Sequence, residues 1–160
     1  ESGPEALLRL MKHDNVLVEI CLTSNDVILN VTGDHHPLPM YLKFGVPVAL
    51  ATDDPGVSRG DITQEYDRAA ATYHLSYREL KNFARNSLTF SFLPGESIWK
   101  NAATGARVAA CAADKPDAAK PSASCAALLS SSEKAQQQWA LERAFSQFES
   151  RFGSGQFGKN

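Results

Sequence analysis

The sequence lacks the features that define several large classes of protein. No apolar run approaches the roughly 20 residues that a membrane-spanning helix requires. No basic segment followed by an apolar core opens the chain, as it would in a signal peptide. The formal net charge is only -2, which argues against binding to nucleic acid or to a membrane surface through bulk charge. We therefore expect neither a nucleic acid nor a membrane as a partner.

The composition that remains is that of a globular protein. The 160 residues are 43% hydrophobic and 21% charged, which is enough for one sizeable core. The chain opens at Glu1 rather than at a methionine, and a helical pattern starts a few residues later. We therefore expect a fragment or a processed product of a longer protein.

Cysteine is scarce, and the three cysteines lie in different surroundings. Cys21 is part of an apolar run and is interpreted as a small buried side chain. Cys111 and Cys125 bracket a segment rich in Ala, Pro, Ser and Lys, where exposed thiols would be a liability, and this favours a disulfide. A metal site is the alternative, although no second pair of Cys or His lies at ligand spacing nearby. A disulfide implies an oxidising compartment, so we expect an extracellular or periplasmic protein.

The spacing of apolar residues predicts an α/β chain. Helices are expected over 4–14, 37–44, 61–74, 76–88 and 132–152, and strands over 16–22 and 46–52. Residues 23–25 are expected to form the turn after the first strand. The order strand, helix, strand is that of a βαβ unit with parallel strands.

The second half of the chain is less regular. Residues 101–132 show no apolar period and are expected to form a surface loop closed by the two later cysteines. Residues 133–152 form the predicted C-terminal helix, whose aromatic stripe is typical of a docking face. Residues 153–160 are expected to fray.

The stretch Val46–Pro55 is the most informative part of the sequence, because an apolar run ends there in two adjacent carboxylates. Alternation along a strand places Val48 and Leu50 against helices and Asp53 on the opposite face. A buried carboxylate costs several kcal/mol unless a cation or hydrogen-bond donors hold it, so we expect Asp53 to bind a cation. Asp54 lies past the strand and is directed elsewhere. The alternative is an ordinary strand-to-loop turn.

Four polar residues are candidates for supporting this site. Glu19 lies on the inner side of the first strand, either behind the site or as a carboxylate paired within the fold. Ser24 and Asn25 follow that strand and are predicted to line the same mouth, since parallel strands end on one side of a sheet. His36, beside His35, either ligates a metal or forms hydrogen bonds within a loop.

Taken in order, these segments resemble the C-terminal part of an adenosine deaminase. The residues that carry the resemblance are Glu19–Asn25, His36-Pro37, Val48–Pro55, Glu65-Tyr66, Asn86-Ser87 and Ser91–Leu93. The match runs over 4–99 and is strongest to the secreted, growth-factor-related adenosine deaminases of the metal-dependent amidohydrolase superfamily. The resemblance implies a (β/α)8 barrel. Residues 1–100 would then hold its last two parallel strands and their helices, followed by a helical C-terminal extension.

The resemblance also implies a chemistry. In this family the first Asp of the pair ligates zinc and contacts the attacking hydroxide, while the second hydrogen-bonds the purine, and these roles fall on Asp53 and Asp54. Zinc lowers the pKa of water enough to supply hydroxide, which would attack C6 of adenosine and release ammonia. The family's histidine ligands and its general-acid glutamate have no match here, and a catalytic zinc needs about three protein ligands. We therefore expect the chain to be inactive without the N-terminal remainder of its barrel.

Other functions stay open on the sequence alone. The chain could be a noncatalytic binding or signalling piece that docks through helix 133–152, or part of a related metal-dependent hydrolase acting on another amine. A homodimer is a further partner hypothesis. The sequence does not indicate which nucleoside is preferred.

Overall fold

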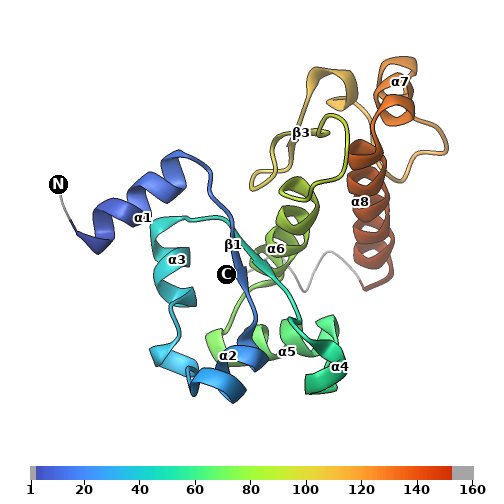
Figure 1. Cartoon of the computed structure of the whole chain (residues 1–160). Coiled ribbons are helices and arrows are strands. Elements are labelled where there is room, and N and C mark those ends of the chain that lie inside the picture. Colours follow the sequence, from blue (N-terminus) through green and yellow to red (C-terminus); the bar gives the residue numbers. More distant parts are fainter. Residues whose placement is uncertain (1–2, 153–160) are drawn as a thin grey trace. The chain divides into compact units, whose positions relative to one another are not determined.

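The computed structural model describes residues 3–152, which separate into two compact units, 3–86 and 87–152 (Figure 1). The tail predicted to fray, 153–160, lies outside the described residues. None of the helices within 3–152 combines the length and the apolar character needed to cross a membrane.

The first unit alternates helices with two short strands. Its elements are α1 (Pro4–His13), β1 (Val18–Ile20), α2 (Leu22–Leu29), the 3-10 turn η1 (Gly33–His35), α3 (Leu38–Phe44), β2 (Val48–Leu50), α4 (Pro55–Ser58), α5 (Ile62–Tyr73) and α6 (Tyr77–Thr89), the last of which continues into the second unit. The predicted helices and both strands are therefore present, with strands shorter than expected.

The two strands form a parallel pair, as predicted. Val18 lies opposite Val48 and Ile20 lies opposite Leu50, while α3 lies between the strands in sequence. The last backbone bond joins the N–H of Ala51 to the carbonyl of Ile20, so the ladder stops there. The chain beyond Ala51 is free to turn.

The core of this unit lies where the sequence pattern placed it. Val48 and Leu50 are 1% and 5% exposed and pack with residues from the helices. The buried cluster comprises Ile20, Leu22, Leu38, Val48, Leu50, Ala69 and Phe83. The side-chain amide of Asn86 donates to the carbonyl of Val48 across 2.8 Å, which fixes α6 against β2.

One secondary-structure prediction for this unit is wrong. Thr23, Ser24 and Asn25 form the beginning of α2 rather than a turn. Short polar residues compete for the backbone in isolated helices, but here side chains from α5 satisfy the first turn of α2. A contact between residues more than 40 positions apart overrides the local preference.

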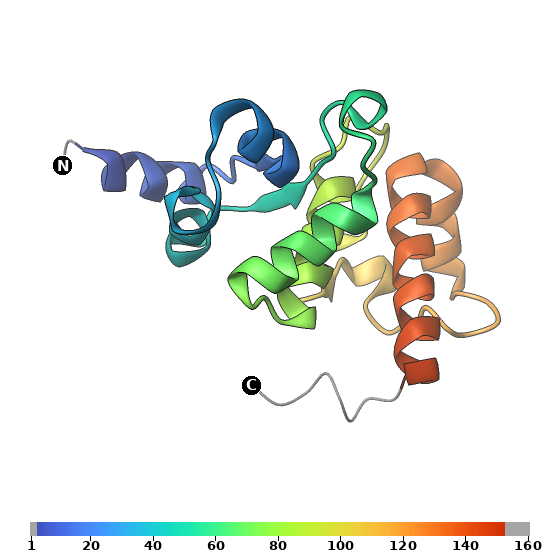
Figure 2. The ribbon, with the colours of Figure 1, turned by 90° about the horizontal axis from the view of Figure 1, so that it is seen from below.

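The second unit also contains more regular structure than the sequence indicates. Its elements are β3 (Trp99–Asn101), β4 (Ala106–Arg107), the 3-10 turn η2 (Ala109–Cys111), α7 (Ala123–Ser131) and α8 (Glu133–Phe152). We expected a loop over 101–132, but this stretch contains β4, which pairs antiparallel with β3, and the helix α7. Helix α7 packs against α8 (Figure 2). The Ala- and Ser-rich sequence of α7 has no apolar stripe, so periodicity could not reveal this helix.

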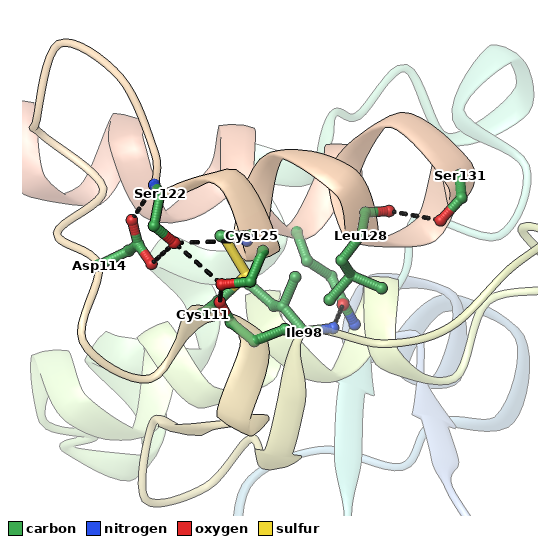
Figure 3. The surroundings of a disulfide bond; sticks show 10 residues. Ile98, Cys111, Asp114, Ser122, Cys125, Leu128 and Ser131 are labelled. Atoms are coloured by element: carbon green, nitrogen blue, oxygen red, sulfur yellow. Dashed lines mark hydrogen bonds between the residues drawn. A yellow bond between two sulfur atoms is a disulfide. The ribbon is translucent and has the colours of Figure 1, made fainter.

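The predicted disulfide is present and lies at the centre of this unit. Cys111 and Cys125 are bonded, are both fully buried, and join η2 to α7 (Figure 3). Asp114 accepts hydrogen bonds from the N–H and the hydroxyl of Ser122, at 2.5 and 2.8 Å. These two bonds lower the pKa of Asp114. The Ser122 hydroxyl also accepts from the N–H of Cys125 and so caps α7.

Candidate functional site

The Asp53 carboxylate lies just past the end of β2. Asp53 has a left-handed backbone, with φ 55, which a non-glycine residue adopts infrequently. The strand ends at Leu50, so the alternation that we used to orient Asp53 does not extend to it. The side chain is exposed rather than buried as we expected, since it lies beyond the two-stranded sheet.

Ser24 holds this carboxylate. Its Oγ donates to Oδ2 of Asp53 across 2.6 Å, the length of a strong hydrogen bond to a charged acceptor. The two residues are 29 positions apart and follow β1 and β2 respectively. The segments that follow the two strands therefore meet through Ser24 and Asp53, and one oxygen of Asp53 is held in a fixed direction.

Asn25 and His36 form a second contact beside the first. Nδ1 of His36 accepts from the N–H of Leu38 at 3.0 Å, so the ring proton lies on Nε2, which donates to Oδ1 of Asn25 at 2.9 Å. His36 is 3% exposed. Burial, followed by the charge of Arg68, lowers its pKa. Both ring nitrogens of His36 are therefore engaged in hydrogen bonds within the chain, as in the loop alternative. The bond to Asn25 connects the segment after η1 to α2.

Glu19 and Cys21 lie on the chain that leads into α2. Glu19 is exposed and pairs in register with Ala49. Cys21 is the free thiol and the N-terminal cap residue of α2. Burial raises its pKa, and the charges of Glu19 and Asp53 add to this shift. The thiol therefore stays protonated near neutral pH.

Asp54 is placed differently from its neighbour. It precedes α4, and its carbonyl accepts from the N–H and the hydroxyl of Ser58. Its carboxylate does not cap α4, and the residue is exposed. The two adjacent carboxylates thus have different surroundings, as predicted.

Sequence reasoning did not identify Glu65 and Arg68 of α5 as part of this region. Both oxygens of Glu65 accept from the N–H of Thr23, at 3.2 and 3.4 Å, and Arg68 pairs with Asp26. Glu65 is only 3% exposed. An acidic residue on the apolar face of a predicted helix was the available signal, because carboxylates are almost never fully buried without a partner.

The described residues do not contain a complete metal site. Within residues 3–152, no three side chains of the His, Cys, Asp and Glu types converge as ligands. Asp53 could provide one ligand to a metal, because its side chain is exposed and Ser24 occupies only its Oδ2. A carboxylate oxygen is an accepted zinc ligand, but a catalytic zinc needs about three.

Comparison with known proteins decides the family. The sequence model of the adenosine deaminase family matches residues 3–102, more than half of the chain. The chain belongs to the adenosine deaminase family. The resemblance drawn from Glu19–Asn25 and Val48–Pro55 is thereby confirmed, and the parallel pair β1–β2 is consistent with part of the barrel that this family implies.

Adenosine deaminases from several bacteria are similar to this chain. The identity is 37% over 92 residues with that of Escherichia coli (strain SMS-3-5 / SECEC), covering 57% of this chain and 28% of the relative. It is 39% over 89 residues with that of Klebsiella pneumoniae, covering 55% and 27%. With that of Aliivibrio fischeri (strain ATCC 700601 / ES114) it is 36% over 88 residues, covering 54% and 26%. The chain therefore spans about a quarter of the length of these relatives.

Proposed function

We propose that this chain supplies one carboxylate ligand and one substrate contact to a zinc-dependent adenosine deaminase. The observation that carries the proposal is the Asp53 carboxylate, held by Ser24 where the two parallel strands end. Family membership supports deamination as the reaction. The remaining ligands and the general acid would come from an N-terminal part of the same barrel, and the chain alone would be inactive.

In this proposal the two carboxylates have separate tasks. Asp53 would hold zinc through the oxygen that Ser24 leaves available and would contact the attacking water. Asp54, exposed and not engaged as a helix cap, hydrogen-bonds the purine ring. Zinc in such a site supplies Lewis-acid chemistry that lowers the pKa of water. In the proposed reaction water adds at C6 of adenosine or deoxyadenosine, the bond from C6 to the amino nitrogen breaks, and ammonia leaves. The product would be inosine or deoxyinosine, respectively.

The disulfide supports a proposal about location. Disulfides form and persist in oxidising compartments and are rare where thiols are kept reduced. The Cys111–Cys125 bond therefore favours an extracellular or periplasmic protein, as in the secreted branch of the family.

The test is turnover by the longest natural chain that contains these 160 residues, referred to below as the whole protein. We expect ammonia release from adenosine, loss of this activity after chelation, and its return with zinc. Parallel assays with deoxyadenosine and adenine separate this function from that of a hydrolase acting on another amine. Absence of turnover in zinc-loaded whole protein would contradict the proposal.

A second candidate function rests on the end of α8. Ala135, Gln138 and Trp139 are buried, whereas Phe148 and Phe152 are 41% and 50% exposed with ring centroids 4.7 Å apart. An exposed aromatic pair is a suitable docking surface for another protein, and the predicted docking helix would use this end. This function requires that Asp53→Ala leaves the biological effect intact, whereas deamination requires its loss.

A further inference from the structure

Helix α2 does not provide the groups that usually stabilise the start of a helix. Its cap residue, Cys21, forms no side-chain capping bond, and its first turn contains no acidic residue. The first N–H groups of a helix lack partners within the helix, and its positive end favours a negative charge. This start therefore depends on water or on a side chain from elsewhere in the chain.

Glu65 of α5 supplies both the capping acceptor and the negative charge that the start of α2 lacks. Its two oxygens lie 3.2 and 3.4 Å from the N–H of Thr23, so one carboxylate acts as a cap and as the compensating charge. At 3% exposure, this carboxylate would be costly without such donors. The capping bond joins residues 42 positions apart, which makes the position of α2 depend on α5.

Arg68 strengthens the same junction one helical turn further along α5. It forms an ion pair with Asp26 and donates to the hydroxyl of Thr23 at 3.3 Å. Residues three apart on a helix share one face, so Glu65 and Arg68 together grip the first turn of α2. Ser24 lies between the two attachment points, Thr23 and Asp26, and is followed by Asn25.

The hydroxyl of Ser24 is the part of α2 that contacts Asp53. A shift of α2 would lengthen or misdirect this 2.6 Å bond. We propose that Glu65 is a positioning residue of the deaminase site, which sets α2 so that Ser24 aligns the Asp53 carboxylate for its metal. This inference rests on the proposed function, because it takes Asp53 as a zinc ligand.

The test compares zinc affinity and steady-state kinetics of the whole protein. Groups that orient metal ligands typically contribute 10- to 100-fold in affinity or activity. We expect Glu65→Ala to weaken zinc binding, measured by competition with a chelator, by about 10- to 100-fold, and to lower kcat with little change in KM. Glu65→Gln keeps an oxygen that can accept from Thr23 and should lose less of both.

Two controls separate positioning from loss of stability. Asp61→Ala removes the capping bond to the N–H of Gln64 at the start of the same helix, and should lower the melting temperature without changing zinc affinity or kcat. In a Ser24→Ala background, Glu65→Ala should add little, since both changes act through one contact. If Glu65→Ala does not fold, Glu65→Gln replaces it in this double-mutant comparison. The loss of zinc affinity caused by Glu65→Gln should then be about threefold or more larger when Ser24 is present than in the Ser24→Ala background.

The outcomes distinguish this inference from the proposed function. If the unmodified protein binds no zinc and Asp53→Ala changes nothing, the proposed function fails and the inference fails with it. If Asp53→Ala abolishes zinc binding while Glu65→Ala behaves like Asp61→Ala, the inference alone is overturned. Additive effects of Ser24→Ala and Glu65→Ala on zinc affinity would also overturn it.

Discussion

The hydroxyl of Ser24 donates to Oδ2 of Asp53 across 2.6 Å and joins α2, which follows β1, to the segment that follows β2. The bond sets the direction of one oxygen of the carboxylate.

Removal of the Ser24 hydroxyl should impair the site without unfolding the protein. For Ser24→Ala in the whole protein, we expect a loss of about 10- to 100-fold in zinc affinity or kcat, because the Asp53 carboxylate loses its directing donor. Chelator competition and steady-state kinetics measure the two effects. Ser24→Thr keeps a hydroxyl and is the matched control; equal losses in both variants would argue against the hydrogen bond as the cause.

Loss of the Asp54 carboxylate should weaken substrate recognition rather than metal binding. A hydrogen bond to a charged group contributes about 1.5–3 kcal/mol, so Asp54→Ala should reduce kcat/KM for adenosine by about 10- to 100-fold. Metal analysis of the same sample should find its zinc content unchanged. A variant that loses zinc would place Asp54 among the ligands instead.

Acidification should destabilise the first unit through His36. Because its pKa is lowered in the folded state, the unfolded chain binds a proton first as the pH falls below about 6.5, the ordinary histidine value. The contribution of His36 to stability is therefore complete above that pH and declines as the pH falls toward the lowered pKa. Urea unfolding of the whole protein between about pH 8 and pH 5, followed by far-UV circular dichroism, measures the decline.

Replacement of His36 provides the comparison for this pH dependence. In His36→Gln the decline in unfolding free energy should be shallower, although the lost bond from the N–H of Leu38 should lower stability at pH 8 by about 1–3 kcal/mol. His35→Gln alters the adjacent exposed histidine and should retain the full decline. Identical profiles for the two variants would contradict the role of His36.

The disulfide should stabilise the second unit selectively. Its cysteines are 14 residues apart, and closing a loop of about 15 residues is worth about 3 kcal/mol in the chain-entropy account. Among residues 1–160, both tryptophans, Trp99 and Trp139, belong to the second unit's core. Urea unfolding of this chain followed by tryptophan fluorescence therefore measures this unit.

The cysteine variants should differ according to their location. Replacement of both Cys111 and Cys125 by Ser should move the fluorescence transition to lower urea, and a reducing agent should have a similar effect on the unmodified chain. Cys21→Ser removes the free thiol of the first unit and should not change the urea concentration at which the fluorescence transition occurs. A disulfide variant as stable as the unmodified chain would show that η2 and α7 are held by packing alone.

The features that follow from local patterns were predictable. The parallel pairing of Val18 with Val48, and the burial of Val48 and Leu50, follow from alternation and apolar runs. The disulfide could be predicted because Cys111 and Cys125 bracket a polar segment. The meeting of Ser24 and Asp53 follows from the geometry of parallel strands, whose ends share one side of a sheet.

The features that depend on distant partners were not predictable in the same way. The start of α2 is stabilised by Glu65, so the local preference of residues 23–25 for a turn gave the wrong answer. The orientation of Asp53 depends on a left-handed backbone that begins after the ladder has ended, beyond the reach of alternation. In α7 a disulfide and a serine cap add to the packing of Leu128 and Leu129, and neither contribution shows in the periodicity of its Ala- and Ser-rich sequence.

The zinc content and adenosine turnover of Asp53→Ala, measured beside those of Asp54→Ala in the whole protein, test the central claim most directly. We predict that Asp53→Ala loses both its zinc and its turnover, whereas Asp54→Ala keeps its zinc and loses substrate affinity. If Asp53→Ala retains stoichiometric zinc and normal turnover, the Asp53 carboxylate is not a metal ligand and the proposed function of this chain is wrong.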